Sequence, residues 1–174
     1  MIIVRAVSSG EGYWYALHIR ARHEKKVAAR LEERGITVFS PTISEVHRWT
    51  DRHVRIQRPL FPCYAFVNIV PSNRNRLNVL NTQGVLGLVG TRGTDIPIPD
   101  KEIDDIRALL ASDAACEPCP FLKVGTRVRV RGGALEGVEG VLVTQNADHS
   151  LIVSIELIQR SISVRLYGYD LRPV

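Results

Sequence analysis

Two cysteines three residues apart have the spacing in this sequence that most resembles a reactive site. Cys116 and Cys119 form a Cys-x-x-Cys pair, which occurs in zinc sites and in thiol redox centres. A zinc site of this kind needs a second ligand pair, and a redox centre needs a strand followed by a helix. Neither pattern surrounds this pair, which lies in a proline-containing segment. We therefore expect no metal and no cofactor here.

Other motifs of catalysis are missing from the sequence. There is no Gly-x-x-x-x-Gly-Lys-Ser/Thr phosphate loop, no Gly-x-Ser-x-Gly nucleophile turn and no His-Glu-x-x-His zinc motif. The five histidines are scattered and form no ligand cluster. The sequence therefore predicts a protein that is not an enzyme.

Arginine is the residue type whose abundance indicates a partner. The chain has 23 basic and 18 acidic side chains, for a formal net charge of +5, and most of the basic ones are arginine. Residues 1–94 hold 14 basic and 6 acidic side chains, whereas residues 112–174 hold seven of each. The guanidinium group suits bidentate contact with phosphate and stacking on bases. The N-terminal half is predicted to bind a polyanion, with an ordinary solvated surface as the alternative.

A strand over residues 13–20 and a helix over residues 24–34, stopped by Gly35, are expected to carry these charges. Spacing of four residues places the later members of the group on one helix face. This basic stripe consists of Arg20, Arg22, Lys25, Lys26, Arg30 and Arg34. Glu32 and Glu33 could instead pair with it and leave an ordinary solvated helix.

The rest of the N-terminal part alternates between strand and helix signals. Strands in an antiparallel meander are predicted over residues 36–39, 43–49, 53–57 and 64–69. They are followed by a short helix over 73–82, a strand over 85–89 and a helix over 100–111 capped by Asp100. This order describes an α+β sandwich.

The chain changes character after residues 112–122, which we expect to be a linker. Valine and arginine alternate strictly over residues 124–131, which indicates a strand with Arg127, Arg129 and Arg131 on one face. Further strand signals lie between glycine, asparagine and aspartate turns, over residues 138–143, 151–158 and 161–166. Short strands at this spacing predict a small all-β barrel.

Targeting signals are not recognisable. No stretch approaches the roughly 20 apolar residues of a membrane span. The first residues are interrupted by Arg5, too early for a signal peptide. Three cysteines cannot build a disulfide framework. We expect a cytoplasmic protein without membrane contact.

Two motifs resemble one family of transcription factors. Residues 124–142, VGTRVRVRGGALEGVEGVL, resemble the KOW motif of SH3-like barrels. Upstream, residues 14–17 (WYAL) and 58–67 (RPLFPCYAFV) resemble the N-terminal domain of the NusG family. The PLFPxY run, residues 20–26 and residues 157–161 resemble the specialised RfaH-like paralogues, which are polysaccharide-operon antiterminators. Cys63 departs from the pattern, because the family more often has Gly or Asn at this position.

The resemblance implies a domain order. A flexible extension would occupy residues 1–12, and a NusG-type antiparallel sheet with flanking helices would occupy residues 13–111. The linker over residues 112–122 would lead to a KOW barrel over residues 123–174.

The resemblance also implies a monomeric transcription elongation and antitermination factor. Its N-terminal domain would bind the clamp helices of the largest RNA polymerase subunit, and the matching residues are Phe61, Tyr64 and Phe66, which could instead be core. Non-template DNA would be read by the surface that corresponds to Arg20, Arg22, Lys26, Arg30, Arg34, Thr82 and Gln83.

The barrel would recruit a small-subunit ribosomal protein or the termination factor Rho. The matching positions are Leu157, Ile158 and Arg160. The alternative from another class is a ribosome-associated or general RNA-binding KOW protein that uses the arginine face of the first barrel strand.

Overall fold

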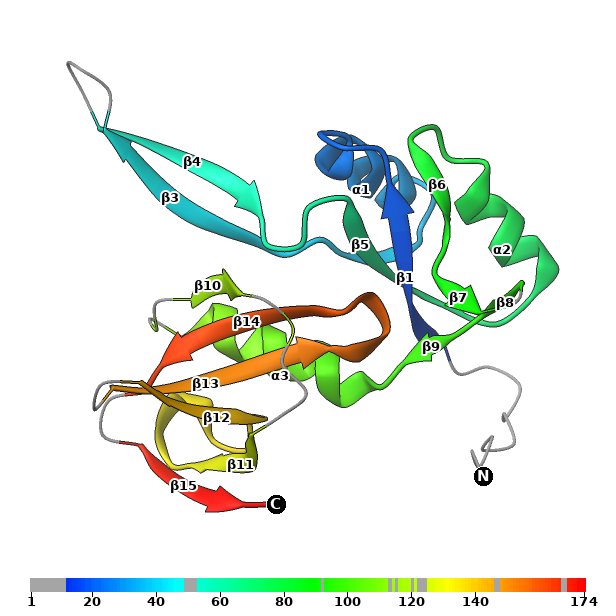
Figure 1. Ribbon diagram of the computed structural model, residues 1–174. Helices are drawn as coiled ribbons and strands as arrows, with labels where there is room; N and C mark the ends of the chain where they lie inside the picture. Colours follow the sequence, from blue (N-terminus) through cyan, green and yellow to red (C-terminus); the bar gives the residue numbers. More distant parts are fainter. Residues whose placement is uncertain are drawn as a thin grey trace. The chain divides into compact units, whose positions relative to one another are not determined.

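A computed structural model describes the chain except for residues 1–11, 49–52, 92, 113, 115, 120, 122–124, 146–147 and 167–168. The chain forms two compact units (Figure 1). The first comprises Met1–Ser40 and Pro62–Pro97, and the second comprises Pro41–Phe61 and Ile98–Val174. The expected N-terminal extension, apart from Gly12, lies outside the described residues, as does the expected turn near residue 50.

A central antiparallel sheet organises the first unit. Its strands lie in the order β2-β5-β1-β6. They are β1 (Tyr13–Ile19), β2 (Thr37–Phe39), β5 (Tyr64–Ile69) and β6 (Val85–Leu88). The short strands β7 (Gly90–Thr91), β8 (Thr94–Asp95) and β9 (Pro97–Ile98) follow; β7 pairs with β8, and β9 pairs with β1 as the fifth strand of the sheet.

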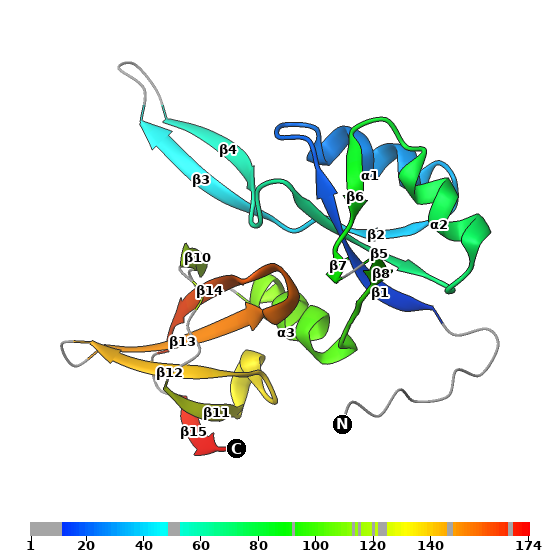
Figure 2. The same ribbon diagram turned by 45° about the vertical axis from the view of Figure 1, so that its right-hand side comes forward.

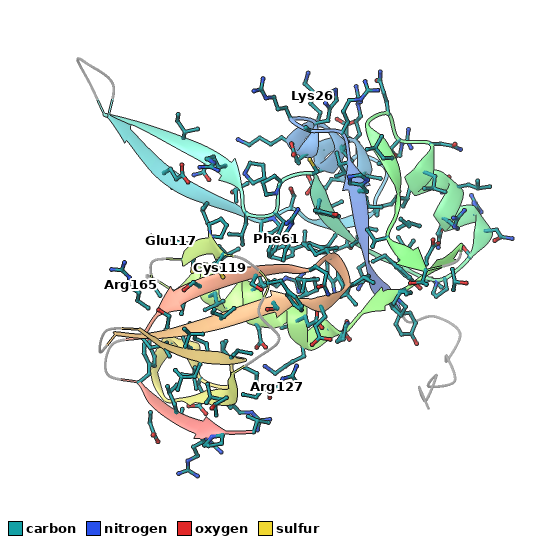
Figure 3. The ribbon with its side chains drawn as sticks, in the orientation of Figure 1. Lys26, Phe61, Glu117, Cys119, Arg127 and Arg165 are labelled. Atoms are coloured by element: carbon teal, nitrogen blue, oxygen red, sulfur yellow. The ribbon has the colours of Figure 1, made fainter. Side chains whose placement is uncertain are left out.

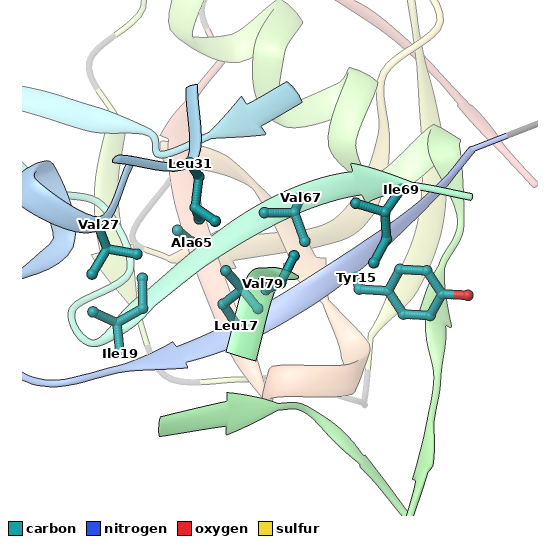
Figure 4. Packing of buried hydrophobic residues seen from close by; sticks show 9 residues of the cluster. All are labelled: Tyr15, Leu17, Ile19, Val27, Leu31, Ala65, Val67, Ile69 and Val79. Carbon is teal, nitrogen blue, oxygen red and sulfur yellow. The ribbon is translucent and has the colours of Figure 1, made fainter. Parts of the chain in front are cut away.

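Two helices, α1 (Glu24–Glu32) and α2 (Asn73–Leu80), cover one face of this sheet (Figure 2). Alternate residues of β1 and β5 meet apolar residues of both helices in one buried core, as period-two strands and amphipathic helices require. The core is drawn in Figure 4 and contains Tyr15, Leu17, Ile19, Val27, Leu31, Ala65, Val67, Ile69 and Val79. The predicted helices over 24–34 and 73–82 are confirmed, with slightly earlier ends.

Aromatic rings occupy the opposite face of the sheet. The ring of Phe39 lies 6.5 Å from that of Trp14, edge to face, and 6.0 Å from that of Phe66. Trp14 and Phe66 are buried. Since aromatic pairs prefer such offset or edge-on geometry, these rings form a second packed layer on the sheet.

The second unit begins with a hairpin. Strands β3 (Thr42–Arg48) and β4 (His53–Pro59) pair only with each other among the described strands, from Thr42 opposite Pro59 to Arg48 opposite His53. The expected continuous meander is therefore wrong, because β2 pairs with β5 in another sheet.

The C-terminal residues form the predicted all-β SH3-like barrel, with strand order β10-β14-β13-β12-β11-β15. Its strands are β10 (Cys116–Cys119), β11 (Thr126–Arg131), β12 (Glu139–Gln145), β13 (Asp148–Ile155), β14 (Arg160–Arg165) and β15 (Asp170–Pro173). Two 3₁₀ turns, η1 (Gly133–Leu135) and η2 (Glu156–Ile158), join strands. All described pairings in this sheet are antiparallel.

Strand β10 lies within the segment expected to be a linker. It pairs with β14, with Cys116 opposite Val164 and Cys119 opposite Ser161. Pro118 is compatible with this because β10 is at the end of the strand order, and an edge strand needs only one set of ladder bonds.

Helix α3 (Asp100–Ala111) is also part of the second unit. Pro99 occupies the N-cap, so Asp100 is the first helical residue and does not cap the helix as expected. It still lies in the first turn, where a carboxylate complements the helix dipole. Among the described residues, no helix combines the length and the apolar character that crossing a membrane would require.

Candidate nucleic-acid interface

Three loops of the first unit meet where β1 ends. The Ile19 N–H donates to the Cys63 carbonyl at 2.8 Å, and the Arg20 N–H donates to the Gly84 carbonyl at 2.9 Å. These bonds join the end of β1 to the loop before β5, and the residue after β1 to the loop before β6. We call this region the three-loop edge and define it as residues 20–23, 62–63 and 81–84.

A buried carboxylate fixes one of these loops. Glu24, in the first turn of α1, is 5% exposed, and its Oε1 accepts a hydrogen bond from the Cys63 N–H at 3.0 Å. An anion at a helix N-terminus is favourable. Cys63 has a φ of +68°, in the left-handed region that glycine and asparagine tolerate best. Cys63 therefore occupies a strained backbone position that glycine or asparagine would fit better.

Two arginines of α1 hold the loop that follows α2. Arg34 Nη1 donates to the Asn78 carbonyl at 3.0 Å and to Thr82 Oγ1 at 2.9 Å, while Arg30 Nη1 donates to the Gln83 carbonyl at 3.0 Å. The unpaired carbonyls at a helix C-terminus attract cations. Thr82 is 1% exposed, and its hydroxyl also donates to Asn78. Arg30, Arg34 and Thr82 thus make contacts within the unit that set the shape of the three-loop edge.

The remaining cations of the basic stripe are open to solvent. Arg20, Arg22, Lys25 and Lys26 are exposed, and within the described part of the chain none makes an ion pair. Lys26 is labelled on α1 in Figure 3. Glu32 and Glu33 make no ion pair with the stripe among the described residues either. The four open side chains form a local excess of positive charge.

The three aromatic residues predicted to bind a protein differ in accessibility. Phe61 is 2% exposed and Phe66 is fully buried, while Tyr64 is half-buried. The Tyr64 ring stacks on that of His18 across β5 and β1, with centroids 5.5 Å apart and planes inclined by 30°. His18 is not among the site residues predicted from the sequence. The available signal was a polar residue that interrupts the apolar run of β1.

The predicted contact residues of the barrel lie at a turn. Leu157 and Ile158 belong to η2, whereas the sequence predicted a strand. Ile158 is buried, Leu157 is half-buried and Arg160 is exposed. Gln159, with a φ of +53°, ends the turn and lets β14 begin.

Each arginine on the outer face of β11 has an acidic partner. Arg127 Nη2 lies 3.2 Å from Glu156 Oε1, and Arg129 Nη2 lies 2.6 Å from Glu139 Oε1. Arg131 Nη1 lies 3.8 Å from Glu136 Oε1. Arg127 is seen in Figure 3. This face of the barrel is therefore close to neutral in charge.

The cysteines of β10 do not form a ligand set. Burial raises the pKa of the Cys116 and Cys119 thiols, which disfavours the thiolate that metals and redox chemistry require. Residues three apart in a strand point to opposite faces. Across the described ranges, no group of three or more His, Cys, Asp or Glu could hold a metal ion.

Two carboxyl groups of α3 are shifted toward their neutral form. Burial raises the pKa of Glu102 to about 7, against a hydrogen bond from the Glu156 N–H at 3.3 Å that lowers it. Burial also raises the pKa of Asp105, while the ammonium group of Lys101 opposes the rise. Asp105 Oδ2 accepts a hydrogen bond from the Glu139 N–H at 3.4 Å, so in the second unit both carboxyl groups of α3 face backbone donors of the barrel.

Comparison with known proteins assigns the family. A family model described as "Transcription termination factor nusG" matches residues 12–107, more than half of the chain. The chain belongs to the NusG family. NusG-family proteins are transcription termination and antitermination factors, and the matched residues include β1, α1 and the whole three-loop edge.

Relatives of the NusG family span almost the whole chain. A transcription termination/antitermination protein NusG of Lactococcus lactis is 28% identical over 97% of this chain and 96% of its own length. The protein of that name from Staphylococcus carnosus is 26% identical over 90% and 93%. A solved structure described as "Domain interaction in Thermotoga maritima NusG" is 22% identical, covers 92% of this chain and 96% of its own, and has a TM-score of 0.52. This last similarity supports the fold.

Proposed function

We propose that this chain is a monomeric, cytoplasmic elongation and antitermination factor that binds transcribing RNA polymerase and contacts the exposed non-template DNA strand. The observation that carries the DNA part is the three-loop edge. Arg20 and Arg22 lie in this edge and Lys25 and Lys26 follow in the first turn of α1, all four exposed and without acidic partners among the described residues. Such side chains bind phosphates, and the amide of exposed Gln83 suits a base edge.

The arginines that hold the loop have a different role in this proposal. Arg30 and Arg34 place Thr82 and Gln83 through the hydrogen bonds described above. They contribute positive charge near the edge, while the direct contacts come from the open side chains.

The polymerase contact would centre on Tyr64. It is the partly exposed member of the predicted trio, and an aromatic ring anchored by stacking on His18 loses little conformational entropy on binding. Phe61 and Phe66 are buried, so they would contribute less to polymerase binding than Tyr64. The partner would be the clamp helices of the largest polymerase subunit.

The barrel would recruit a small-subunit ribosomal protein or Rho through the η2 turn. Leu157 and Arg160 offer the accessible apolar and basic contacts, and Ile158 fixes the turn from inside. The alternative, an RNA-binding KOW protein that uses β11, is not favoured because its three arginines are paired with glutamates.

We also propose that the chain is a specialised, RfaH-like member of the family. The PLFPCY run and residues 20–26 and 157–161 support this assignment. A specialised paralogue would be encoded at the head of a long surface-polysaccharide operon, so the gene neighbourhood tests the assignment directly.

Binding to a reconstituted elongation complex tests the function. Truncating a central aromatic anchor costs about 2 kcal/mol or more, so Tyr64→Ala should weaken polymerase binding at least tenfold. Replacing Arg20 and Arg22 with Ala should lower affinity when the non-template strand is exposed, and should reduce the salt slope by roughly 0.7 per contact.

Arg74→Ala is the matched control for these variants. Arg74 is exposed in the first turn of α2, at the end away from the three-loop edge, and makes no ion pair among the described residues. Equal binding by all variants would contradict the proposal.

A further inference from the structure

We propose that His18 and Gly87 form a stacking site for one unpaired nucleobase of a single-stranded nucleic acid, beside the three-loop edge. This inference rests on the proposed function and deepens it, because it assigns residues that hold a base where the open cations hold phosphates.

The site begins as a row of residues across three strands. Tyr64 on β5 lies opposite His18 on β1, and His18 lies opposite Gly87 on β6. Facing residues of an antiparallel pair share a side of the sheet, so the three positions follow one another on one face. Tyr64 stacks on the His18 ring from the β5 side. His18 is exposed, and opposite it on β6 Gly87 contributes no side chain.

The space above Gly87 is open. A Cβ atom placed on this residue would meet nothing within 4 Å. The backbone does not require glycine there, since Gly87 has no positive φ of the kind found at Gly84 and no crowding of the kind found at Gly90. A strand interior normally favours a side chain, because glycine weakens it. The missing side chain therefore leaves a slot beside an exposed aromatic ring, and a flat ligand fits such a slot.

An irregular strand shapes the same place. The pairing of β1 with β6 shifts between His18 and Ile19, so Leu86 is an extra residue on β6. Leu86 is 58% exposed, an unusual environment for a leucine in a strand. Bulges often re-aim side chains next to functional sites. Since β6 ends the strand order of this sheet, no described strand pairs with its outer edge.

Charge identifies the ligand. Arg20 lies two residues after His18, and its N–H donates to the carbonyl of Gly84, the residue before β6, so the period of two places Arg20 on the same side as His18. It is exposed and has no ion-pair partner in the described ranges. A nucleotide presents a flat base next to an anion, which matches a free ring face next to a free guanidinium. Base stacking on aromatic side chains contributes substantially to single-strand binding and tolerates different bases.

Gly87→Val is the most direct test. It fills the slot, meets no neighbouring atom at its Cβ, and adds a residue type that favours strands. The full chain would be titrated with labelled single-stranded DNA, single-stranded RNA and duplex DNA oligonucleotides, some with 2-aminopurine, whose fluorescence falls on stacking. We expect Gly87→Val and His18→Ala to weaken single-strand binding at least fivefold and to abolish the quenching, with duplex binding unchanged. The DNA and RNA titrations show which strand the site takes.

His18→Phe is the matched control, because it keeps an aromatic face and should retain quenching. The inference is overturned if folded Gly87→Val and His18→Ala bind single strands as the parent does while the Arg20 and Arg22 variants are weakened. It is also overturned if His18→Ala reduces polymerase binding alone, which would make this a protein-docking surface. Failure of the proposed function gives a different result, in which the arginine variants do not change binding either.

Discussion

Removing Arg34 should separate a positioning role from direct contact with nucleic acid. Arg34→Ala deletes two charge-assisted hydrogen bonds, to the Asn78 carbonyl and to Thr82 Oγ1. A hydrogen bond to a charged group contributes about 1.5 to 3 kcal/mol. Asn78 keeps the hydrogen bond from the Thr82 hydroxyl, so no buried acceptor is left without a partner. The low end of this range applies, and the lost interaction of Arg34 with the α2 dipole adds a few tenths of a kcal/mol.

We therefore expect the free energy of unfolding of the first unit to fall by about 2 kcal/mol. This lowers the urea midpoint by roughly 1 M. Trp14 is buried in that unit, so its fluorescence reports the transition in a Trp49→Phe background. Arg74→Ala is the control and should change stability by less than about 0.5 kcal/mol.

The same variant has a second readout in nucleic-acid binding. If Arg34 acts by positioning the loop, affinity falls while the salt slope stays constant, because no phosphate contact is lost. If Arg34 itself holds a phosphate, the slope falls by roughly 0.7. Stability equal to that of Arg74→Ala, together with a reduced slope, would refute the positioning argument.

Three further predictions concern backbone strain, proton linkage and the barrel. Cys63→Gly should raise the free energy of unfolding by about 1 kcal/mol, seen as a higher melting temperature, because glycine removes the cost of a positive φ. Because the pKa of Glu102 is raised, its carboxyl group between about pH 4.5 and about pH 7 is protonated in the folded state and ionised in the unfolded state. Stability of the second unit should therefore fall as pH rises through that range, and Glu102→Gln should flatten this dependence in urea titrations at several pH values. The C-terminal segment should remain a barrel in the full chain, since Gly132, Gly133 and Gly137 have positive φ and glycine disfavours a helix; circular dichroism showing more helix than α1, α2 and α3 supply would contradict this.

Local patterns in the sequence were sufficient for most elements. The alternation in residues 126–131 and the helical spacing of Val27 and Leu31 each reflect burial on one side of a single element. Strand β10 was not predicted because Cys-Glu-Pro-Cys has no alternation of apolar and polar residues. Its pairing with β14 is a tertiary interaction that local sequence does not show. The sequence predicted β3 and β4 as part of a meander because strand signals do not reveal which strands pair.

The sequence was sufficient to predict which residue types make up the candidate site, but it did not predict the contacts that each residue makes. The cations Arg20 and Lys26 were identified from their charge and spacing, and the family resemblance suggested their role in DNA binding. The contacts of Arg30 and Arg34 with residues 78–83 join positions more than 40 residues apart, which local spacing cannot reveal. The pairing of His18 with Gly87 depends on strand register, which one sequence does not specify.

Because β10 lies within the expected linker of residues 112–122, the covalent link between α3 and the barrel is shorter than the sequence predicted. Helix α3 ends at Ala111 and β10 begins at Cys116, which leaves four residues, 112–115, between them. Ala111 and Cys116 are five residues apart, so even a fully extended link keeps their Cα atoms within about 18 Å of each other. Since α3 and the barrel belong to one compact unit, this short link presents backbone donors of the barrel to the α3 carboxyl groups at an effective concentration in the millimolar range. The hydrogen bonds from the Glu139 N–H to Asp105 and from the Glu156 N–H to Glu102 therefore form within one chain and do not depend on protein concentration.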